Sequence, residues 1–120
     1  MTREQAIYGY LSTLGIPVYA EGTVPAHAEY PYLTYHYTVG GCGEAAALSL
    51  RFTDRTSSFA SSDEFFRAAE QFIPPDGMIV PYSDGAVWLW RGSPFLQREC
   101  EPRDRAVRHA DVKADAVFLE

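Results

Sequence analysis

The sequence predicts one α+β domain: an antiparallel or mixed β-sheet with two α-helices packed on one face. Two stretches repeat apolar residues at the spacing of an amphipathic helix, and several others alternate apolar and polar residues as strands do. The chain has 120 residues, of which 47% are hydrophobic and 14% aromatic, enough for one core but not for two. No repeat or linker divides the sequence, so residues 1–120 are expected to form a single domain.

The first helix is predicted close to the beginning of the chain. Thr2 and Gln5 have the spacing of a capping box, which marks a helix N-terminus. The apolar residues that follow recur at helical spacing: Ile7, Tyr10, Leu11 and Leu14. Gly15 and Pro17 then end the helix, because glycine accepts the left-handed conformation of a C-cap and proline cannot continue the helix.

Three extended segments are predicted in the next part of the chain. Pro17 to Ala20 is a short one. Tyr32 to Val39 alternates cleanly and is rich in β-branched and aromatic residues, which predicts a strand. Alternation resumes from Leu48 to Thr53, and these last two segments are expected to pair as an antiparallel hairpin around the glycine-rich Gly40–Gly43.

The second helix is predicted to begin at Ser61, with Glu64 completing another capping box. Its apolar stripe is broad and consists of Phe65, Phe66, Ala69, Phe72 and Ile73. Pro74 and Pro75 end it.

A hairpin is predicted after the second helix. Asp84-Gly85 is a strong turn signal and joins Met78–Tyr82 to Ala86–Arg91. In Val87-Trp88-Leu89-Trp90 both alternating sets are apolar, so this strand is expected to be covered on both faces.

Two more strands complete the predicted sheet. Gly92-Ser93-Pro94 is expected to turn the chain into a short strand from Phe95 to Glu99. The final stretch is rich in Ala, Lys and Asp, but from His109 to Phe118 its apolar residues recur with period two, which predicts a strand and not a helix.

Charge and targeting signals exclude several classes of partner. The chain has 16 acidic and 10 basic residues, a net charge of −6, so non-specific binding to DNA or to an anionic membrane is not expected. The arginines between Arg98 and Arg108 alternate with acidic residues, which is typical of a solvated mixed-charge surface. Neither a signal peptide nor a transmembrane stretch is recognisable, so we expect synthesis inside the cell, with Cys42 and Cys100 reduced.

The residues that could support catalysis do not form a recognisable motif. His27, His36 and His109 lack the short spacing of a metal site, and the latter two fall on the polar sides of predicted strands, where we expect them to face solvent. Cys42 has no basic neighbour to lower its pKa. The glycines around it do not form a phosphate-binding loop. We therefore predict a protein that is not an enzyme and has no catalytic residues, metal or cofactor.

Eight tyrosines and two tryptophans raise the alternative of a nucleic-acid stacking surface. Such surfaces have basic flanks, whereas Tyr30, Tyr32, Tyr35 and Tyr37 are surrounded by neutral residues and Glu29. The aromatic residues are better explained as sheet core and subunit interface, where aromatics are enriched.

Three segments resemble a known family. They are Ala6-Ile7-Tyr8-Gly9-Tyr10-Leu11 with Gly15-Ile16-Pro17-Val18-Tyr19-Ala20, then Val24-Pro25 with Tyr30-Pro31-Tyr32-Leu33-Thr34-Tyr35, and finally Asp84 through Gln97. In this order they resemble the tail-terminator proteins of long-tailed phages and prophages, also described as tail-completion, tail-to-head joining or minor capsid proteins. The resemblance spans most of the chain but omits Gly40–Ala47 and Arg98–Arg108.

The resemblance implies a tail-terminator-like fold and a structural virion protein at the tail–head junction. Its implied partners are further copies of the chain in a hexameric ring, the tail-tube protein that the ring caps, and the head-side connector or stopper protein. Genomic DNA would pass through the ring without specific binding, and an acidic subunit suits this because it offers few charges to neutralise phosphates. The implied location is the virion tail or neck, after synthesis in the bacterial host cytoplasm, with no membrane partner.

The candidate subunit-interface loop consists of Gly40, Gly41, Cys42, Gly43 and Glu44. Because three of these residues are glycines, we expect the loop to order only against a neighbouring subunit. Two other functions stay open: a head-completion or stopper component of the neck, and a small ligand-binding regulatory domain that uses the aromatic surface. A metal-assisted enzyme would instead carry stoichiometric metal.

Overall fold

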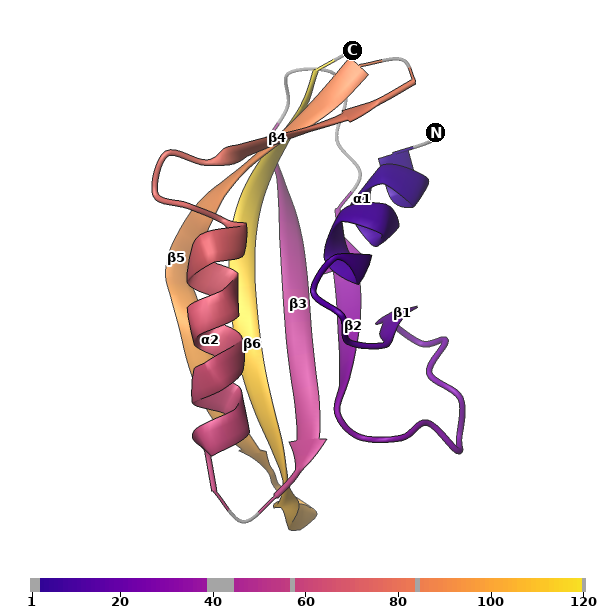
Figure 1. The fold of residues 1–120 in the computed structure, drawn as a ribbon, viewed down its shortest axis with the longest axis vertical. Coiled ribbons are helices and arrows are strands. Elements are labelled where there is room, and N and C mark those ends of the chain that lie inside the picture. The colour runs from indigo at the N-terminus through magenta and orange to yellow at the C-terminus, as the bar shows by residue number, and fades with distance from the viewer. Residues whose placement is uncertain (1–2, 39–44, 57, 84, 120) are drawn as a thin grey trace.

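The structure is a computed structural model that describes residues 3–38, 45–56, 58–83 and 85–119. Its elements follow one another along the chain as α1 Arg3–Ser12, β1 Val18–Ala20, β2 Tyr32–Tyr37, β3 Ala45–Arg55, α2 Ala60–Phe72, β4 Met78–Tyr82, β5 Gly85–Glu101 and β6 Asp104–Leu119. Figure 1 shows both helices on the same side of one long, twisted sheet. The predicted α+β class is confirmed.

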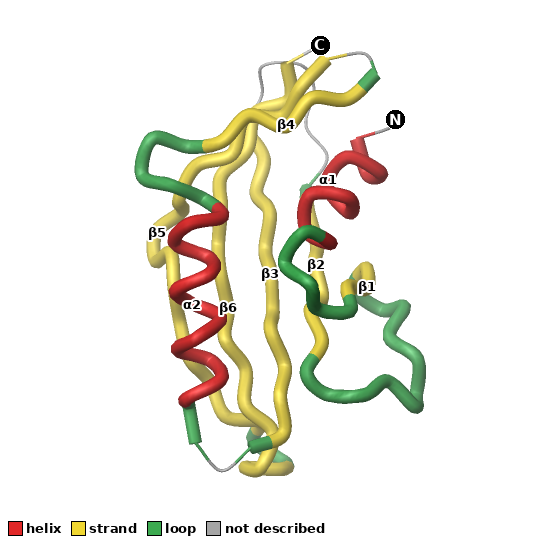
Figure 2. The backbone as a smooth tube through the Cα atoms, viewed as in Figure 1, coloured by secondary structure: helices red, strands yellow, loops and turns green. Residues whose placement is uncertain are grey.

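The six strands form a single mixed sheet in the order β1-β2-β3-β6-β5-β4. The short β1 runs parallel to β2, and every other neighbouring pair is antiparallel. The last strand along the chain, β6, therefore lies in the interior of the sheet, between β3 and β5 (Figure 2). This confirms the strand that was predicted from period two between His109 and Phe118.

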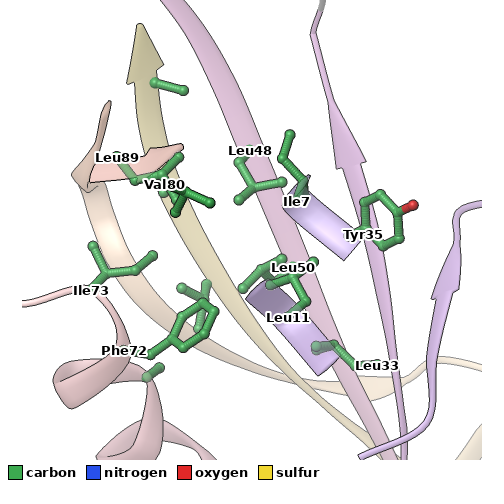
Figure 3. Close-up of a cluster of buried hydrophobic side chains, with 14 of the residues drawn as sticks. Ile7, Leu11, Leu33, Tyr35, Leu48, Leu50, Phe72, Ile73, Val80 and Leu89 are labelled. Carbon is green, nitrogen blue, oxygen red and sulfur yellow. The ribbon is translucent and has the colours of Figure 1, made fainter. Parts of the chain in front are cut away.

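The core lies between the sheet and the two helices. From α1, Ile7 and Leu11 are buried, and α2 buries Phe65, Ala69 and Phe72. The sheet contributes every second residue of its interior strands, including Leu48 and Leu50 of β3. Figure 3 shows Ile7 and Leu11 of α1 and Phe72 and Ile73 at the end of α2 over the same face of the sheet, in one cluster with Leu48 and Leu50 of β3.

Aromatic contacts join the helices to each other and to the sheet. The hydroxyl of Tyr10 in α1 donates a hydrogen bond to the carbonyl of Phe72 in α2, and the two rings stack with centroids 4.0 Å apart. Burial raises the pKa of Tyr10. Phe52 of β3 stacks on Phe65 of α2 at 4.8 Å and 11°. These contacts fix both helices on the same face of the sheet.

The capping box predicted for the second helix at Ser61 is wrong. The helix begins at Ala60 and its N-cap is Phe59, whose side chain makes no capping hydrogen bond. The carbonyl of Phe59 accepts the first helical hydrogen bond from the N–H of Asp63 at 2.9 Å, which places Ser61 inside the first turn. The end of the first helix agrees better with the prediction, since Gly15 has the positive φ of 75° that its role as a terminator requires.

The turn predicted at Gly92–Pro94 is also wrong, because β5 continues through it to Glu101. The register shows how the chain does this: between Arg91 and Leu96 β5 advances five residues, while β6 advances two, from Ala114 to Val112. The surplus residues form a bulge in an otherwise continuous strand. Glycine is needed at position 92, since a Cβ there would lie 2.9 Å from the carbonyl oxygen of Lys113.

Candidate interaction surface

The second face of the sheet is not covered by any described helix. We call it the open face. Its side chains are those that alternate with the core positions, and the register aligns them in rows across the strands. One central row contains Thr34, Arg51, Asp111 and Gln97 from four neighbouring strands. The open face is therefore built mainly by β2, β3, β6 and β5, with β4 at its edge.

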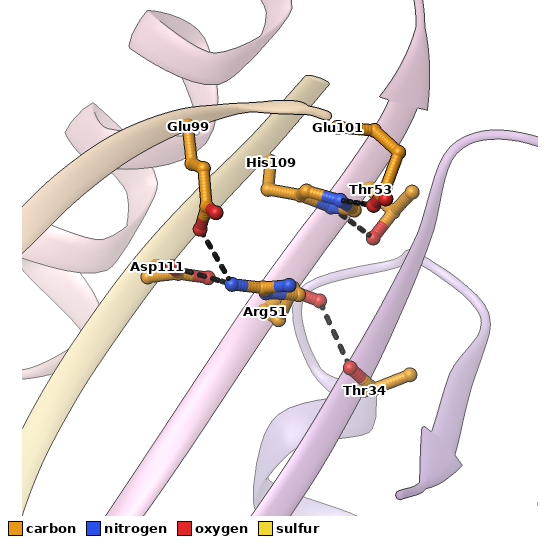
Figure 4. Close-up of polar contacts among 7 residues, drawn as sticks. All are labelled: Thr34, Arg51, Thr53, Glu99, Glu101, His109 and Asp111. Atoms are coloured by element: carbon orange, nitrogen blue, oxygen red, sulfur yellow. Dashed lines mark hydrogen bonds and ion pairs between the residues drawn. The ribbon is translucent and has the colours of Figure 1, made fainter. Parts of the chain in front are cut away.

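An ion-pair network occupies the centre of the open face (Figure 4). The Arg51 guanidinium donates to both carboxylate oxygens of Asp111, through Nε at 2.8 Å and Nη2 at 3.0 Å. The same Nη2 donates to Glu99 at 2.9 Å. The hydrogen bonds with Asp111 raise the pKa of Arg51 further above its usual value. A two-pronged arginine–carboxylate pair has a defined geometry, so it orders the side chains of β3, β6 and β5 relative to one another.

His109 lies beside this network but is buried. Only 6% of its surface is exposed, so the expectation that it faces solvent is wrong. Its Nδ1 lies 3.1 Å from the hydroxyl of Thr53 and its Nε2 lies 3.0 Å from the carboxylate of Glu101. Because β6 is an interior strand, neighbours on both sides cover the imidazole. His36, on the more peripheral β2, is exposed as expected.

Thr53, His109 and Glu101 have the hydroxyl–imidazole–carboxylate order of a hydrolytic triad. A nucleophile must be reachable by a substrate carbonyl, and Thr53 is only 3% exposed. The hydrogen bond with His109 is the main cause that lowers the pKa of Glu101, which favours the charged carboxylate. We interpret the three residues as a polar contact that ties together β3, β6 and the end of β5.

A shallow hollow of about 430 Å³ lies over the centre of the open face. Its polar side chains come from the central strands, and Glu21 and Pro94 also contribute to its lining. The residues that define its floor and rim are Thr34, His36, Ser49, Arg51, Gln97, Asp111 and Lys113. With charges of both signs around it, the hollow suits a polar or zwitterionic contact better than an apolar ligand.

An apolar patch occupies the end of the open face where β4, β5 and β6 meet. It consists of Ile79, Trp88 and Leu119, which are 58%, 43% and 42% exposed. Ile79 is in register with Trp88, and the rings of Trp88 and Trp90 pack with their centroids 5.3 Å apart. The prediction that Val87–Trp90 is covered on both faces is therefore wrong for this chain alone, because Trp88 has no covering layer among the described residues.

The other predicted site residues are not brought together. His36 and His109 pair with Ser49 and Thr53, four residues apart along β3, and His27 lies exposed in the loop between β1 and β2. Within the described ranges, no group of three histidine, cysteine or acidic side chains could hold a metal ion. Cys100 is a free thiol whose sulfur accepts a hydrogen bond from Arg108 at 3.2 Å.

The candidate interface loop, Gly40, Gly41, Cys42, Gly43 and Glu44, lies outside the described residues. The sequence alone does not predict the polar network of the open face. Arg51, Glu99 and Asp111 are far apart in the chain, and only the strand register brings them together. The apolar patch does have a sequence signal, the doubly apolar run Val87–Trp90, but the same run also predicts a strand that is buried on both faces.

Comparison with known proteins finds no matching family model, no similar curated protein and no similar solved structure. Among the described residues, no helix is long and apolar enough to span a membrane.

Proposed function

We propose that this protein is a self-assembling structural subunit that forms a ring at the phage tail–head junction, where it terminates the tail tube and joins it to the head connector. The observation that carries the assembly role is the apolar patch on the open face. A monomer that exposes Ile79, Trp88 and Leu119 side by side presents the type of surface that subunit contacts use. The specific place in the virion comes from the resemblance of the three sequence segments.

The remaining surface is compatible with this role. The net charge of −6 offers little attraction to DNA that moves through a ring. The polar residues of the open face are held by Arg51 and His109 in fixed positions, which lowers the entropy lost when a partner binds. A rigid mixed-charge surface next to an apolar patch has the usual composition of an interface, with an apolar centre and a polar rim.

Electron microscopy of the purified protein with its tail-tube protein tests the proposal. We expect tubes that end in a ring and stop growing, whereas the tube protein alone should form tubes of unlimited length. Tubes that grow without limit in the presence of the protein would overturn the terminator role. A pull-down distinguishes the closest alternative, because a stopper component of the neck would retain the portal or adaptor protein and not the tube protein.

The hollow on the open face supports a second candidate, a small ligand-binding regulatory domain. At about 430 Å³ it falls within the size range of small-molecule sites, roughly 300–1,000 Å³. Such a protein would remain monomeric at high concentration and would bind a polar ligand through Arg51. If the wild type forms rings and the Arg51→Met variant forms them equally well, this candidate is excluded.

A further inference from the structure

The helix-covered side of the molecule has an apolar groove between α2 and the segment that follows α1. The groove has a volume of about 310 Å³. One wall is the segment that follows α1 together with Pro31, the other is the first turns of α2, and Phe52 of β3 forms the floor. The lining residues are Leu14, Ile16, Pro31, Phe52, Ser61, Glu64, Phe65 and Ala68. At about 30 Å³ for each water molecule, this is room for one or two bulky side chains.

One polar atom in the groove lacks a partner. Ser61 lines the groove, and its buried hydroxyl makes no hydrogen bond with the described residues. A buried hydroxyl without a partner costs free energy, so such groups in native proteins usually have one. The neighbouring Ser62 hydroxyl is in the same state, but Ser62 does not line the groove. An incoming group with a donor or acceptor at its edge would satisfy Ser61.

The apolar patch and the groove lie on opposite sides of the sheet. Ile79 and Trp88 belong to the open face, whereas Phe65 and Ala68 belong to the helix layer. The patch therefore cannot reach the groove of its own chain. It can reach the groove of another copy, and such a contact leaves a free patch at one end of the pair and a free groove at the other. Repetition of a head-to-tail contact of this kind gives a closed ring when the rotation closes.

We propose that the apolar patch of one copy, with Ile79 and Trp88 at its centre, docks into the apolar groove beside α2 of the next copy. This inference rests on the proposed assembly role and names the two surfaces that would form the subunit contact. The patch exposes more than half of Ile79, and the groove is an apolar recess on the opposite side of the sheet. The indole N–H group of Trp88 is a hydrogen-bond donor, and the hydroxyl of Ser61 can accept from it.

The areas are consistent with a second copy as the occupant. The three patch residues expose on the order of 300 Å², if a large side chain presents about 200 Å². A stable contact buries about 800 Å² on each partner, so the polar residues around the patch must take part. The two longest dimensions of the chain, 44 and 29 Å, limit the open face to roughly 1,300 Å². A face of this size can supply the required area, and a small ligand could not cover it.

Two variants with matched controls test the contact. Ile79→Asp places a charge in the patch, and Tyr8→Asp does the same at a side chain of similar exposure, 48%, outside both surfaces. Ala68→Phe fills the groove, and Gln71→Phe adds the same bulk at an exposed position of α2. Analytical ultracentrifugation should show assemblies for the wild type and both controls, and monomers for the two test variants. The dissociation constant should rise at least about tenfold in each test variant.

Mixing the two test variants gives the sharper result. The Ile79→Asp chain keeps its groove and the Ala68→Phe chain keeps its patch, so the mixture should form a complex of one copy of each and nothing larger. Circular dichroism shows whether each variant is folded, and Glu64→Trp, at the exposed rim, replaces Ala68→Phe if that variant does not fold.

The outcomes separate this inference from the proposed function. If the wild type assembles and the test variants assemble equally well, or their mixture stays monomeric, the patch–groove contact is wrong while the ring-forming role stands. A wild-type chain that stays monomeric at high concentration, both alone and with the tail-tube protein, overturns the assembly role together with this contact.

Discussion

Replacing Gly77 by alanine should destabilise the protein by about 3 kcal/mol, from two sources that the structure separates. Gly77 joins α2 to β4 with a φ of 85°, a conformation that costs an L-residue about 1–2 kcal/mol. A Cβ there would also lie 2.6 Å from the carbonyl oxygen of Leu89 and 2.7 Å from Nε1 of Trp88. Because one of these neighbours is backbone, relief requires a shift of β5, and such overpacking costs about 1–3 kcal/mol.

Gly15→Ala provides the matched control. Gly15 has a similar φ of 75°, but a Cβ there would meet nothing within 4 Å. Both substitutions stiffen the unfolded chain to the same extent, so that effect cancels when the two are compared. Urea unfolding followed by circular dichroism gives the free energy of unfolding for each, and Gly77→Ala should lose about 1–3 kcal/mol more than Gly15→Ala. Equal losses would refute the steric argument.

Three further predictions concern the polar residues. Exchanging Arg51 for Met and Asp111 for Asn, singly and together, should give a coupling energy of about 0.5–1 kcal/mol in urea unfolding, since both side chains are partly exposed; additive losses would show no interaction. The pKa of Glu101 lies below 4.5, so its contribution is present at neutral pH and lost as the pH falls through that lowered value; Glu101→Gln should flatten this acid limb, and an unchanged limb would contradict the assignment. Burial and Glu4 raise the pKa of Tyr35 to about 12, so absorbance titration should show this phenolate only near that pH, and Tyr35→Phe should remove the step.

Period-two and helical patterns predicted most of the elements because they depend on burial on one side only. Ala110, Val112, Ala114 and Ala116 alternate with polar residues, and the structure buries each of these four. That alternation correctly outweighed the helix-favouring composition of the segment. A sheet with two helices on one face satisfies this pattern, and the structure confirms it.

The pattern could not say what lies over the second face. Val87–Trp90 is apolar on both sides. From a single sequence, a strand buried within the chain cannot be distinguished from a strand whose second face is covered by a partner. His109 shows the converse problem: a polar residue on the polar side of β6 is nevertheless buried, because Glu101 and Thr53 come from strands that only the register places beside it. Both errors concern contacts between distant segments.

Local turn signals were the least reliable. Gly92-Ser93-Pro94 has the composition of a turn, yet the pairing of β5 with β6 on both sides absorbs it as a bulge. Ser61 and Glu64 have the spacing of a capping box, yet the helix begins one residue earlier because the carbonyl of Phe59 can already accept the N–H of Asp63. Local sequence signals of this kind therefore do not fix the ends of helices and strands on their own.

The interior position of β6 has a consequence for how the protein is made. Strands β1 to β3 form one half of the sheet and β4 with β5 form the other, and β6 is the only described strand that pairs with both. During synthesis both halves emerge from the ribosome before residues 104–119, each with a long unpaired edge. Such edges favour pairing with another chain. We therefore expect newly made chains to depend on a chaperone until β6 has emerged, and a chain that stops before β6 to aggregate.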